Sequence, residues 1–175
     1  GGAVRDMLLD RAAKDYDVAT DARPEEVRKL FRRSLQVGAQ FGVVMVIEAG
    51  ETVEVATFRS EADYRDGRHP SKVEFADAMQ DASRRDFTIN GMFYDPIEEK
   101  LLDFVCGRED IQKRIVRTIG NADERFNEDY LRMIRAVRFS TQLGFSIETG
   151  TFEAIKKNAS KIARVSAERI AIELE

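Results

Sequence analysis

The pattern of hydrophobic and polar positions changes along the chain. In the first part, helical spacing and period-two segments are mixed, whereas from Asp123 onward only the helical period remains. We therefore predict an α+β region over 1–120 and an all-α region over 121–175, with the boundary near Gly120. The helices predicted before the boundary cover 3–9, 24–31, 76–85 and 108–113, and the strands cover 15–19, 43–48, 52–58, a segment ending at Tyr94, and 101–104.

Local signals add detail to this pattern. Two β-branched runs flank Ala49-Gly50-Glu51, a spacing that predicts a hairpin. Thr20 or Asp21 is the expected cap of the helix that begins at Pro24, because short polar side chains accept bonds from the first turn. Residues 59–74 show no period and are interpreted as a mobile loop.

In the all-α region we predict helices at 123–142, at 149–158 and from Ser166. On the first helix, one apolar stripe comprises Phe126, Tyr130, Met133, Ile134 and Val137. Asp129, Arg132 and Arg135 step along the opposite side, followed by Arg138 and with Phe139 among them. The simplest reading of that side is an ion pair between Asp129 and Arg132 that contributes a few tenths of a kcal/mol.

Composition is that of a soluble, cytoplasmic protein: 43% of the 175 residues are hydrophobic and 34% are charged, and no apolar run is long enough to span a bilayer. Cys106, the one cysteine, is expected to be a small buried hydrophobe, and His69 a loop residue. The net charge of −4 does not indicate nucleic-acid binding. The chain starts at Gly1 without a methionine and stops within a helical run, so we expect it to be part of a longer protein.

Asp15 and Asp17 are the strongest candidates for chemistry. One residue apart on a predicted strand, they point to the same face, while Tyr16 and Val18 point to the other and are expected to pack into a core. Two close carboxylates repel each other unless a cation lies between them. Hard oxygen ligands of this kind suit Mg²⁺. Glu54 is a candidate third carboxylate, although its place between two valines also fits a solvent-facing residue.

A glycine pair precedes the carboxylates by twelve intervening residues, at Gly1-Gly2. Glycines before a helix let backbone N–H groups approach a phosphate, and the helix N-terminus adds positive potential. Arg5 in the first turn can reach the same anion. A phosphate site beside a metal-binding pair fits phosphoryl-group chemistry in which two metal ions activate a hydroxyl and stabilise the leaving group.

Three long segments carry a family resemblance. Residues 1–20 (GGAVRD followed by KDYDVAT) resemble the first signature of polymerase-β-type nucleotidyltransferases, in the form found in class II CCA-adding enzymes and bacterial poly(A) polymerases. Residues 84–90 (RRDFTIN) resemble the second signature, and 128–139 (EDYLRMIRAVRF) the nucleotide-selecting helix. Residues 101–111 resemble the linking motif, with Cys106 where a glycine is common. The motifs occur in the family's order and cover almost the whole chain.

The resemblance implies a nucleotidyltransferase head followed by a helical neck. It implies that Asp15 and Asp17 hold the metal ions, whereas Glu54 stays a candidate catalytic residue on the grounds of its strand position alone. It also implies a nucleotide site for CTP and ATP. Within that site, Gly2 and Arg5 contact the triphosphate, Arg85, Asp86 and Asn90 lie near the ribose and phosphates, Asp129 and Arg132 read the base, and Arg135 and Arg138 complete the surface.

The resemblance further implies that the substrate is the 3′ end of tRNA or another RNA. Residues 59–72 correspond to a flexible element that helps the enzyme switch from C to A addition, although they equally suit a solvated loop. A strand before Gly1 and the body and tail domains that grip the tRNA are expected to lie outside this chain.

Three functions remain open. The first is CCA addition to tRNA, favoured by Glu128-Asp129 and by the 37–42 stretch. The second is poly(A) synthesis or A-only addition. The third is a non-catalytic nucleotide- or RNA-binding module, which predicts the loss of a key carboxylate or arginine, and none is missing.

Overall fold

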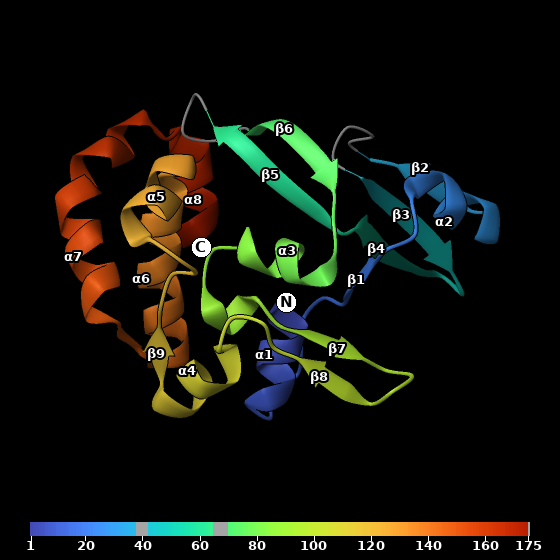
Figure 1. Cartoon of the computed structure of the whole chain (residues 1–175), viewed down its shortest axis with the longest axis horizontal. Coiled ribbons are helices and arrows are strands. Elements are labelled where there is room, and N and C mark those ends of the chain that lie inside the picture. Colours follow the sequence, from blue (N-terminus) through green and yellow to red (C-terminus); the bar gives the residue numbers. More distant parts are fainter. Residues whose placement is uncertain (38–41, 65–69, 175) are drawn as a thin grey trace.

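The computed structural model describes residues 1–37, 42–64 and 70–174, with the backbone alone at 62–64 and 70–72. Small sheets and short helices form one side of the molecule and a group of helices forms the other (Figure 1). Up to residue 116, the helices are α1 (Gly2–Leu8), α2 (Pro24–Leu30), α3 (Ala78–Ser83), the 3-10 turn η2 (Thr88–Asn90) and α4 (Gly107–Lys113). The strands are β1 (Asp17–Thr20), β2 (Ser34–Gln36), β3 (Val43–Glu48), β4 (Glu51–Thr57), β5 (Arg59–Tyr64), β6 (Pro70–Phe75), β7 (Phe93–Asp95), β8 (Lys100–Leu102) and β9 (Ile115–Val116).

A four-stranded sheet with the order β1-β4-β3-β2 carries the predicted carboxylates. β3 and β4 form the predicted hairpin, and the positive φ angles of Ala49 (52°) and Gly50 (88°) make its turn. β1 pairs with β4 in parallel. The valines of one face pack with Val27 of α2 in a small core of Val27, Val44, Val46 and Val55. The period-two pattern therefore places one face of this sheet against α2.

Residues 59–64 and 70–74 belong to two strands and not to the loop that the sequence predicted. β5 and β6 pair in an antiparallel ribbon, with Arg59 opposite Phe75 and Glu61 opposite Val73. The strands carry polar residues on both faces, so they lack the alternation by which a half-buried strand is recognised. Residues 65–69, which include His69, lie outside the described residues, as do 38–41.

The largest core joins the two predicted regions. Phe87, Ile89 and Met92 pack against Ala136 and Phe139, together with the remaining members Ile111, Val116, Leu143 and Phe145. Phe87 and Phe139 meet edge to face, with ring centroids 5.8 Å apart. Residues on both sides of Gly120 thus share one core, and the domain boundary stays a prediction.

Helices dominate after Gly120, as predicted. They are α5 (Ala122–Glu128), α6 (Leu131–Leu143), α7 (Thr149–Asn158), the 3-10 segment η3 (Ala159–Arg164) and α8 (Ala167–Leu174), with a short strand β10 (Ser146–Ile147) beside β9. The helix expected over 123–142 is broken, because Asp129 adopts extended backbone angles (φ −148°, ψ 110°) between α5 and α6. Phe126, Tyr130 and Met133 are buried, but Val137 is 50% exposed, so the predicted apolar stripe ends before it.

Two smaller predictions are also wrong. The N-cap of α2 is Arg23, not Thr20 or Asp21, and its backbone N–H donates to Glu26. Cys106 is exposed rather than buried. Its backbone is left-handed (φ 62°), a conformation that costs glycine less than it costs a residue with a side chain.

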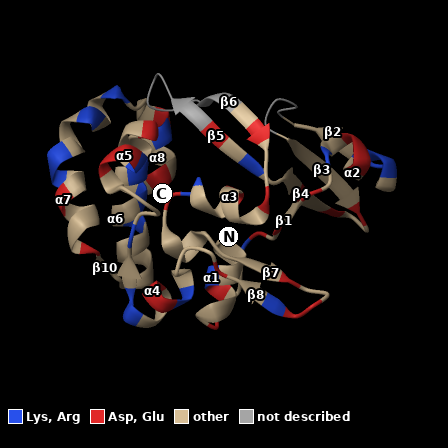
Figure 2. Ribbon diagram, in the orientation of Figure 1, with Lys and Arg blue, Asp and Glu red and all other residues tan. Residues whose placement is uncertain are grey.

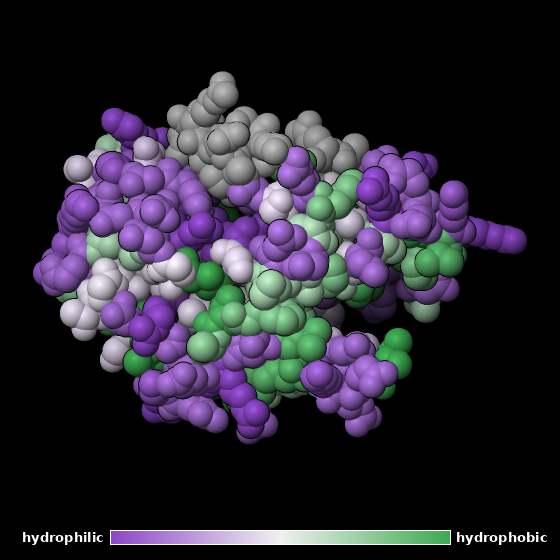
Figure 3. All heavy atoms as spheres, viewed as in Figure 1, coloured by the Kyte–Doolittle hydropathy of each residue, from purple (hydrophilic) through white to green (hydrophobic). Residues whose placement is uncertain are grey.

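The surface is mixed in charge. Acidic and basic residues are interspersed over both halves (Figure 2), and hydrophilic residues cover most of the helical half of the face shown in Figure 3. Within the described residues, no helix has both the length and the apolar character needed to cross a bilayer.

Candidate active site

The sheet places Asp17 and Glu54 side by side. Asp17 is the first residue of β1, and the parallel register sets it opposite Glu54 in β4. Directly opposite residues point to the same face, and this face is the one away from the valines that pack on α2. Both side chains are exposed. The alternation of β4 therefore directs Glu54 to solvent, but next to Asp17.

Asp15 lies before β1 rather than within it, so the strand period does not fix its direction. The prediction that Tyr16 and Val18 enter a core is wrong, because Tyr16 is 69% exposed and Val18 46% exposed. The physical reason is that β1 is an edge strand of the described sheet and α2 packs over its neighbours.

The carboxylates of Asp15, Asp17 and Glu54 have no hydrogen-bond or ion-pair partner among the described residues. Exposed, unpaired oxygen ligands are what a hard divalent cation binds, so the donor set fits Mg²⁺ or a similar ion. In the described parts of the chain, no three acidic, histidine or cysteine side chains are already arranged as a metal cluster. The structure therefore supports the type of ligand but leaves the metal assignment a prediction.

The predicted phosphate-binding residues lie around the start of α1. Arg5 donates to the side chain of Asn90 at 2.8 Å and also pairs with Asp6. Arg85 donates to the backbone carbonyl of Asn90 at 3.1 Å, and its guanidinium lies over the Phe93 ring, 4.5 Å from the centroid. A Cβ added at Gly2 would lie 3.8 Å from Arg5, which is ordinary contact, so Gly2 is close to this group. The first and second signatures thus meet in space.

Asp86 links these residues to the helical half. One carboxylate oxygen accepts from Asn90 at 3.2 Å and from the backbone N–H of Phe87, and the other pairs with Arg135 at 2.7 Å. Burial alone would raise the pKa of Asp86, but Arg135 and these hydrogen bonds outweigh it and hold the pKa below its usual value. Asp86 is therefore a charged acceptor in a buried network.

Glu173 of α8 extends the network. Its two oxygens pair with Arg135 at 3.0 Å and with Arg138 at 2.7 Å. Asp86 and Glu173 together raise the pKa of Arg135 despite its burial. The sequence analysis missed Glu173, which gives no local signal beyond its place in the last predicted helix.

Phe139 lies at the centre of the arginines, as expected from its position in the sequence. The guanidinium carbons of Arg5, Arg135 and Arg138 lie 5.2, 5.3 and 4.3 Å from its ring centroid. Such cation–π contacts contribute about 0.5–2 kcal/mol each, depending on desolvation. This side of α6 is therefore a packed surface between head and helices rather than a solvated face.

The side chains of the two predicted base-reading residues do not bond to one another, although the backbone N–H of Arg132 donates to the carbonyl of Asp129 at 3.1 Å. Asp129 pairs with Arg169 of α8 at 2.8 Å, and its other oxygen accepts from the backbone N–H of Leu131. Arg132 pairs with Glu128 at 2.5 Å and donates to the carbonyl of Arg84 at 3.2 Å. The ion pair considered between Asp129 and Arg132 is thus absent from the structure, because Asp129 lies outside the helix.

Asp81 is a second residue that the sequence analysis missed. This buried carboxylate pairs with Arg84 at 2.7 Å and Arg85 at 3.0 Å and accepts from the backbone N–H of Arg59. The arginines hold its pKa below the usual value, although burial opposes them. The spacing of three and four residues on a helix was the available signal. Asp81 therefore holds in place Arg85, which the sequence analysis predicted to lie near the nucleotide.

Comparison with known proteins agrees with this architecture. Similar solved structures include the Bacillus stearothermophilus CCA-adding enzyme in complex with CTP (TM-score 0.90, 42% identity, 99% of this chain and 42% of that chain) and the Thermotoga maritima CCA-adding enzyme complexed with tRNA (TM-score 0.78, 25% identity, 100% and 41%). The predicted class, an α+β nucleotidyltransferase head with a helical extension, is confirmed.

The family follows from sequence models. Residues 1–117 match the poly A polymerase head domain, and 144–175 match a segment described as a probable RNA and SrmB binding site of polymerase A. The chain belongs to the poly A polymerase head domain family. It is 48% identical to the CCA-adding enzyme of Bacillus subtilis and 47% identical to that of Geobacillus kaustophilus over its whole length, and it spans 44% and 43% of them. It therefore spans less than half the length of these relatives.

Proposed function

We propose that the protein containing this chain transfers CMP and AMP from CTP and ATP to the 3′ end of tRNA and releases pyrophosphate. The observation that carries the proposal is the pair of exposed, unpaired carboxylates on the sheet, Asp17 opposite Glu54. Its support from relatives is that they are named CCA-adding enzymes and that solved examples are complexes with CTP, with ATP and with tRNA.

Two divalent cations fit this chemistry. Nucleotidyltransferases of this family generally use divalent metals, and we propose Mg²⁺, held by Asp15 and Asp17 with Glu54 beside them. The ions supply charge neutralisation at the attacking hydroxyl and the leaving pyrophosphate. The protein's own part is to position the reactants, since no covalent nucleophile is required.

We assign the triphosphate to Gly2, Arg5 and Arg85, at the start of α1. The arginines already converge on Asn90, so the positive charge is pre-positioned for an anion. Arg135 and Arg138 complete the surface from α6, with Asp86 and Asn90 as the polar link. In this division, residues 1–120 carry transfer and 121–175 carry nucleotide selection.

We assign base selection to Asp129 and Arg132. In the nucleotide-free structure each is held by another residue, Asp129 by Arg169 and Arg132 by Glu128. To bind a base, Asp129 and Arg132 must therefore either release these ion pairs or make contacts to the base in addition to them. Arg132 keeps its donor to the Arg84 carbonyl as an anchor next to the second signature.

The deciding experiment supplies labelled CTP and ATP with tRNA that lacks CCA to the full-length protein. The expected product is tRNA extended by two C residues and one A. Long A tracts or A-only addition would assign poly(A) synthesis or A addition instead, the second candidate that the family description favours. Retention of full activity by Asp15→Ala and Asp17→Ala would contradict the metal assignment, and no transfer at all would leave a non-catalytic binding module.

A further inference from the structure

The carboxylates begin a row that crosses the entire sheet. The register aligns Asp17 with Glu54, Glu54 with Met45, and Met45 with Leu35, so one residue from each of the four strands lies in line. Directly opposite residues share a face, so the apolar pair Met45 and Leu35 continues the carboxylate row. At ~4.8 Å between strands, Leu35 lies ~14 Å from Asp17.

This face of β2 is open. Leu35 is 61% exposed and Val37 is 53% exposed. The alternate residue Gln36 points the other way, where its side chain accepts from Arg28 of α2 at 3.5 Å. Because α2 covers the valine face, Leu35 is left exposed on the carboxylate face, and its neighbour Met45 is half-buried.

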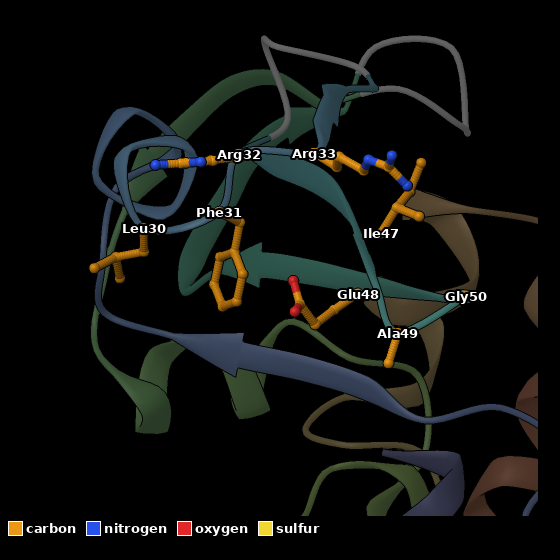
Figure 4. A pocket seen from close by; sticks show the side chains of 8 residues that line it. All are labelled: Leu30, Phe31, Arg32, Arg33, Ile47, Glu48, Ala49 and Gly50. Carbon is orange, nitrogen blue, oxygen red and sulfur yellow. The ribbon is translucent and has the colours of Figure 1, made fainter.

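An arginine lies near the far end of the row. Arg33 precedes β2, and its carbonyl accepts from the backbone N–H of Ile47 at 2.9 Å, which places it two residues along the chain from Leu35 and therefore on the same side of the sheet. Arg32, Arg33 and Ile47 line a hollow of about 460 Å³ at this corner, bordered by the β3–β4 turn (Figure 4). Both arginines are exposed. The open face thus runs from two carboxylates, over an apolar strip, to Arg33, and Glu48 also lines the hollow at this corner.

We propose that the single-stranded 3′ segment of the RNA substrate lies along this face, with its terminal hydroxyl at Asp17 and its preceding nucleotides over Met45 and Leu35. The proposal rests on the proposed function. An RNA end presents apolar base and ribose surfaces and phosphate charges, which match an apolar strip that ends at Arg33. Continuity with the carboxylate row favours RNA over a protein partner, because the hydroxyl to be extended must reach those carboxylates.

The test measures steady-state kinetics of the full-length protein with Leu35→Glu and, separately, Arg33→Glu. We expect the KM for RNA to rise by about tenfold, the size of one lost base contact, while the KM for CTP and ATP is unchanged. For Arg33→Glu, the salt dependence of RNA binding should also weaken, because one phosphate contact is lost. Thermal melting checks that the exposed substitutions leave the fold intact.

Two matched controls separate position from chemistry. Ile97→Glu places the same acid at an 88% exposed apolar site in the β7–β8 turn. Arg28→Glu reverses a charge on α2, on the opposite face of the sheet. Both should leave the KM for RNA close to that of the wild type.

Each outcome of these measurements either supports or overturns the proposed RNA path. An unchanged KM for RNA in both test variants, with transfer intact and abolished by Asp17→Asn, overturns the RNA path and leaves the proposed function standing. A change of oligomeric state by Leu35→Glu with unchanged RNA kinetics assigns the face to a second copy and also overturns it. If the wild-type protein transfers no nucleotide, the proposed function fails and the path fails with it.

Discussion

The two halves of the candidate site are built in opposite ways. On the sheet, the carboxylates of Asp15, Asp17 and Glu54 are exposed and have no described partner. At the joint with the helices, Asp86, Arg135 and Glu173 form ion pairs in a largely buried network. The carboxylates of one half thus have no partner among the described residues, whereas the charges of the other half pair with one another.

The unpaired carboxylates of the sheet and the paired charges of the joint should differ in what they contribute to stability. Like charges on the sheet repel each other, and no described residue pairs with these carboxylates, so we attribute their arrangement to the proposed metal site. The arginine network stabilises the fold whether or not it binds a nucleotide, because removing one partner leaves a buried charge. Substitutions in the two halves should therefore separate activity from stability.

The largest expected effect is on activity at the sheet. Asp17→Asn should reduce nucleotidyl transfer by about 10²–10³-fold, because a metal ligand contributes several kcal/mol of charge stabilisation. Its stability should stay close to wild type. The assay is incorporation of labelled CTP into tRNA, with Asp21→Asn, another exposed carboxylate, as the control. Transfer within a few-fold of wild type would remove Asp17 from the metal site.

The next effect is on stability at the joint. Asp86→Ala leaves Arg135 with Glu173 as its remaining carboxylate and should lower the free energy of unfolding by about 3 kcal/mol, the lower end for a broken buried pair. Urea unfolding measures this change. Glu153→Ala, which removes an exposed pair with Lys156, should change it by less than about 1 kcal/mol. Equal changes in the two variants would show that the joint is no more stabilising than the surface.

The sequence predicted the sheet half better than the joint. The period of two in β4 defines which face Glu54 shares, and the hairpin and α2 follow from local signals. The contact of Asp86 with Arg135 spans 49 residues, and that of Arg138 with Glu173 spans 35. No local pattern encodes such distant pairs, so motif resemblance named Asp86, Arg135 and Arg138 while Glu173 was missed.

Local sequence signals also failed to predict two strands that consist mainly of polar residues. β5 and β6 have too few apolar positions for a strand period, although they pair along their described length. No glycine or proline at Asp129 indicates that the helix breaks there. The carboxylate of Asp129 stabilises the break by accepting a hydrogen bond from the backbone N–H of Leu131. The position of Asp129 relative to Arg132 therefore could not be predicted from the sequence.

A smaller effect is expected on the pH dependence of stability. The folded-state pKa of Asp86 is lowered, so its contribution is complete above the unfolded pKa of about 3.9 and is lost as pH falls through the folded value. Stability should fall by up to about 1.4 kcal/mol per pH unit per such group below pH 4. The pKa of Asp81 is also lowered, so Asp81 should contribute to the loss of stability at low pH in the same direction.

Urea unfolding of the wild type and Asp86→Asn between pH 7 and 3 isolates the Asp86 contribution. The variant should be less stable than the wild type at pH 7. The difference in their free energies of unfolding should narrow as pH falls below 4, because the wild type then loses the charge of Asp86, which the variant lacks at every pH. A gap that is constant with pH would show that Asp86 does not titrate with the expected sign.

The smallest effect is on stability at the sheet in the absence of metal. Asp15→Asn and Asp17→Asn should change the free energy of unfolding by less than about 0.5 kcal/mol, as for exposed positions without partners, and relief of repulsion should make the change slightly stabilising. Adding Mg²⁺ at about ten times its Kd should stabilise the wild type by about 1.4 kcal/mol and the Asp17→Asn variant by much less. Thermal melting with and without Mg²⁺ measures both. Equal stabilisation of wild type and variant would locate the bound ion elsewhere and would remove the contrast between an unsatisfied sheet and a satisfied joint.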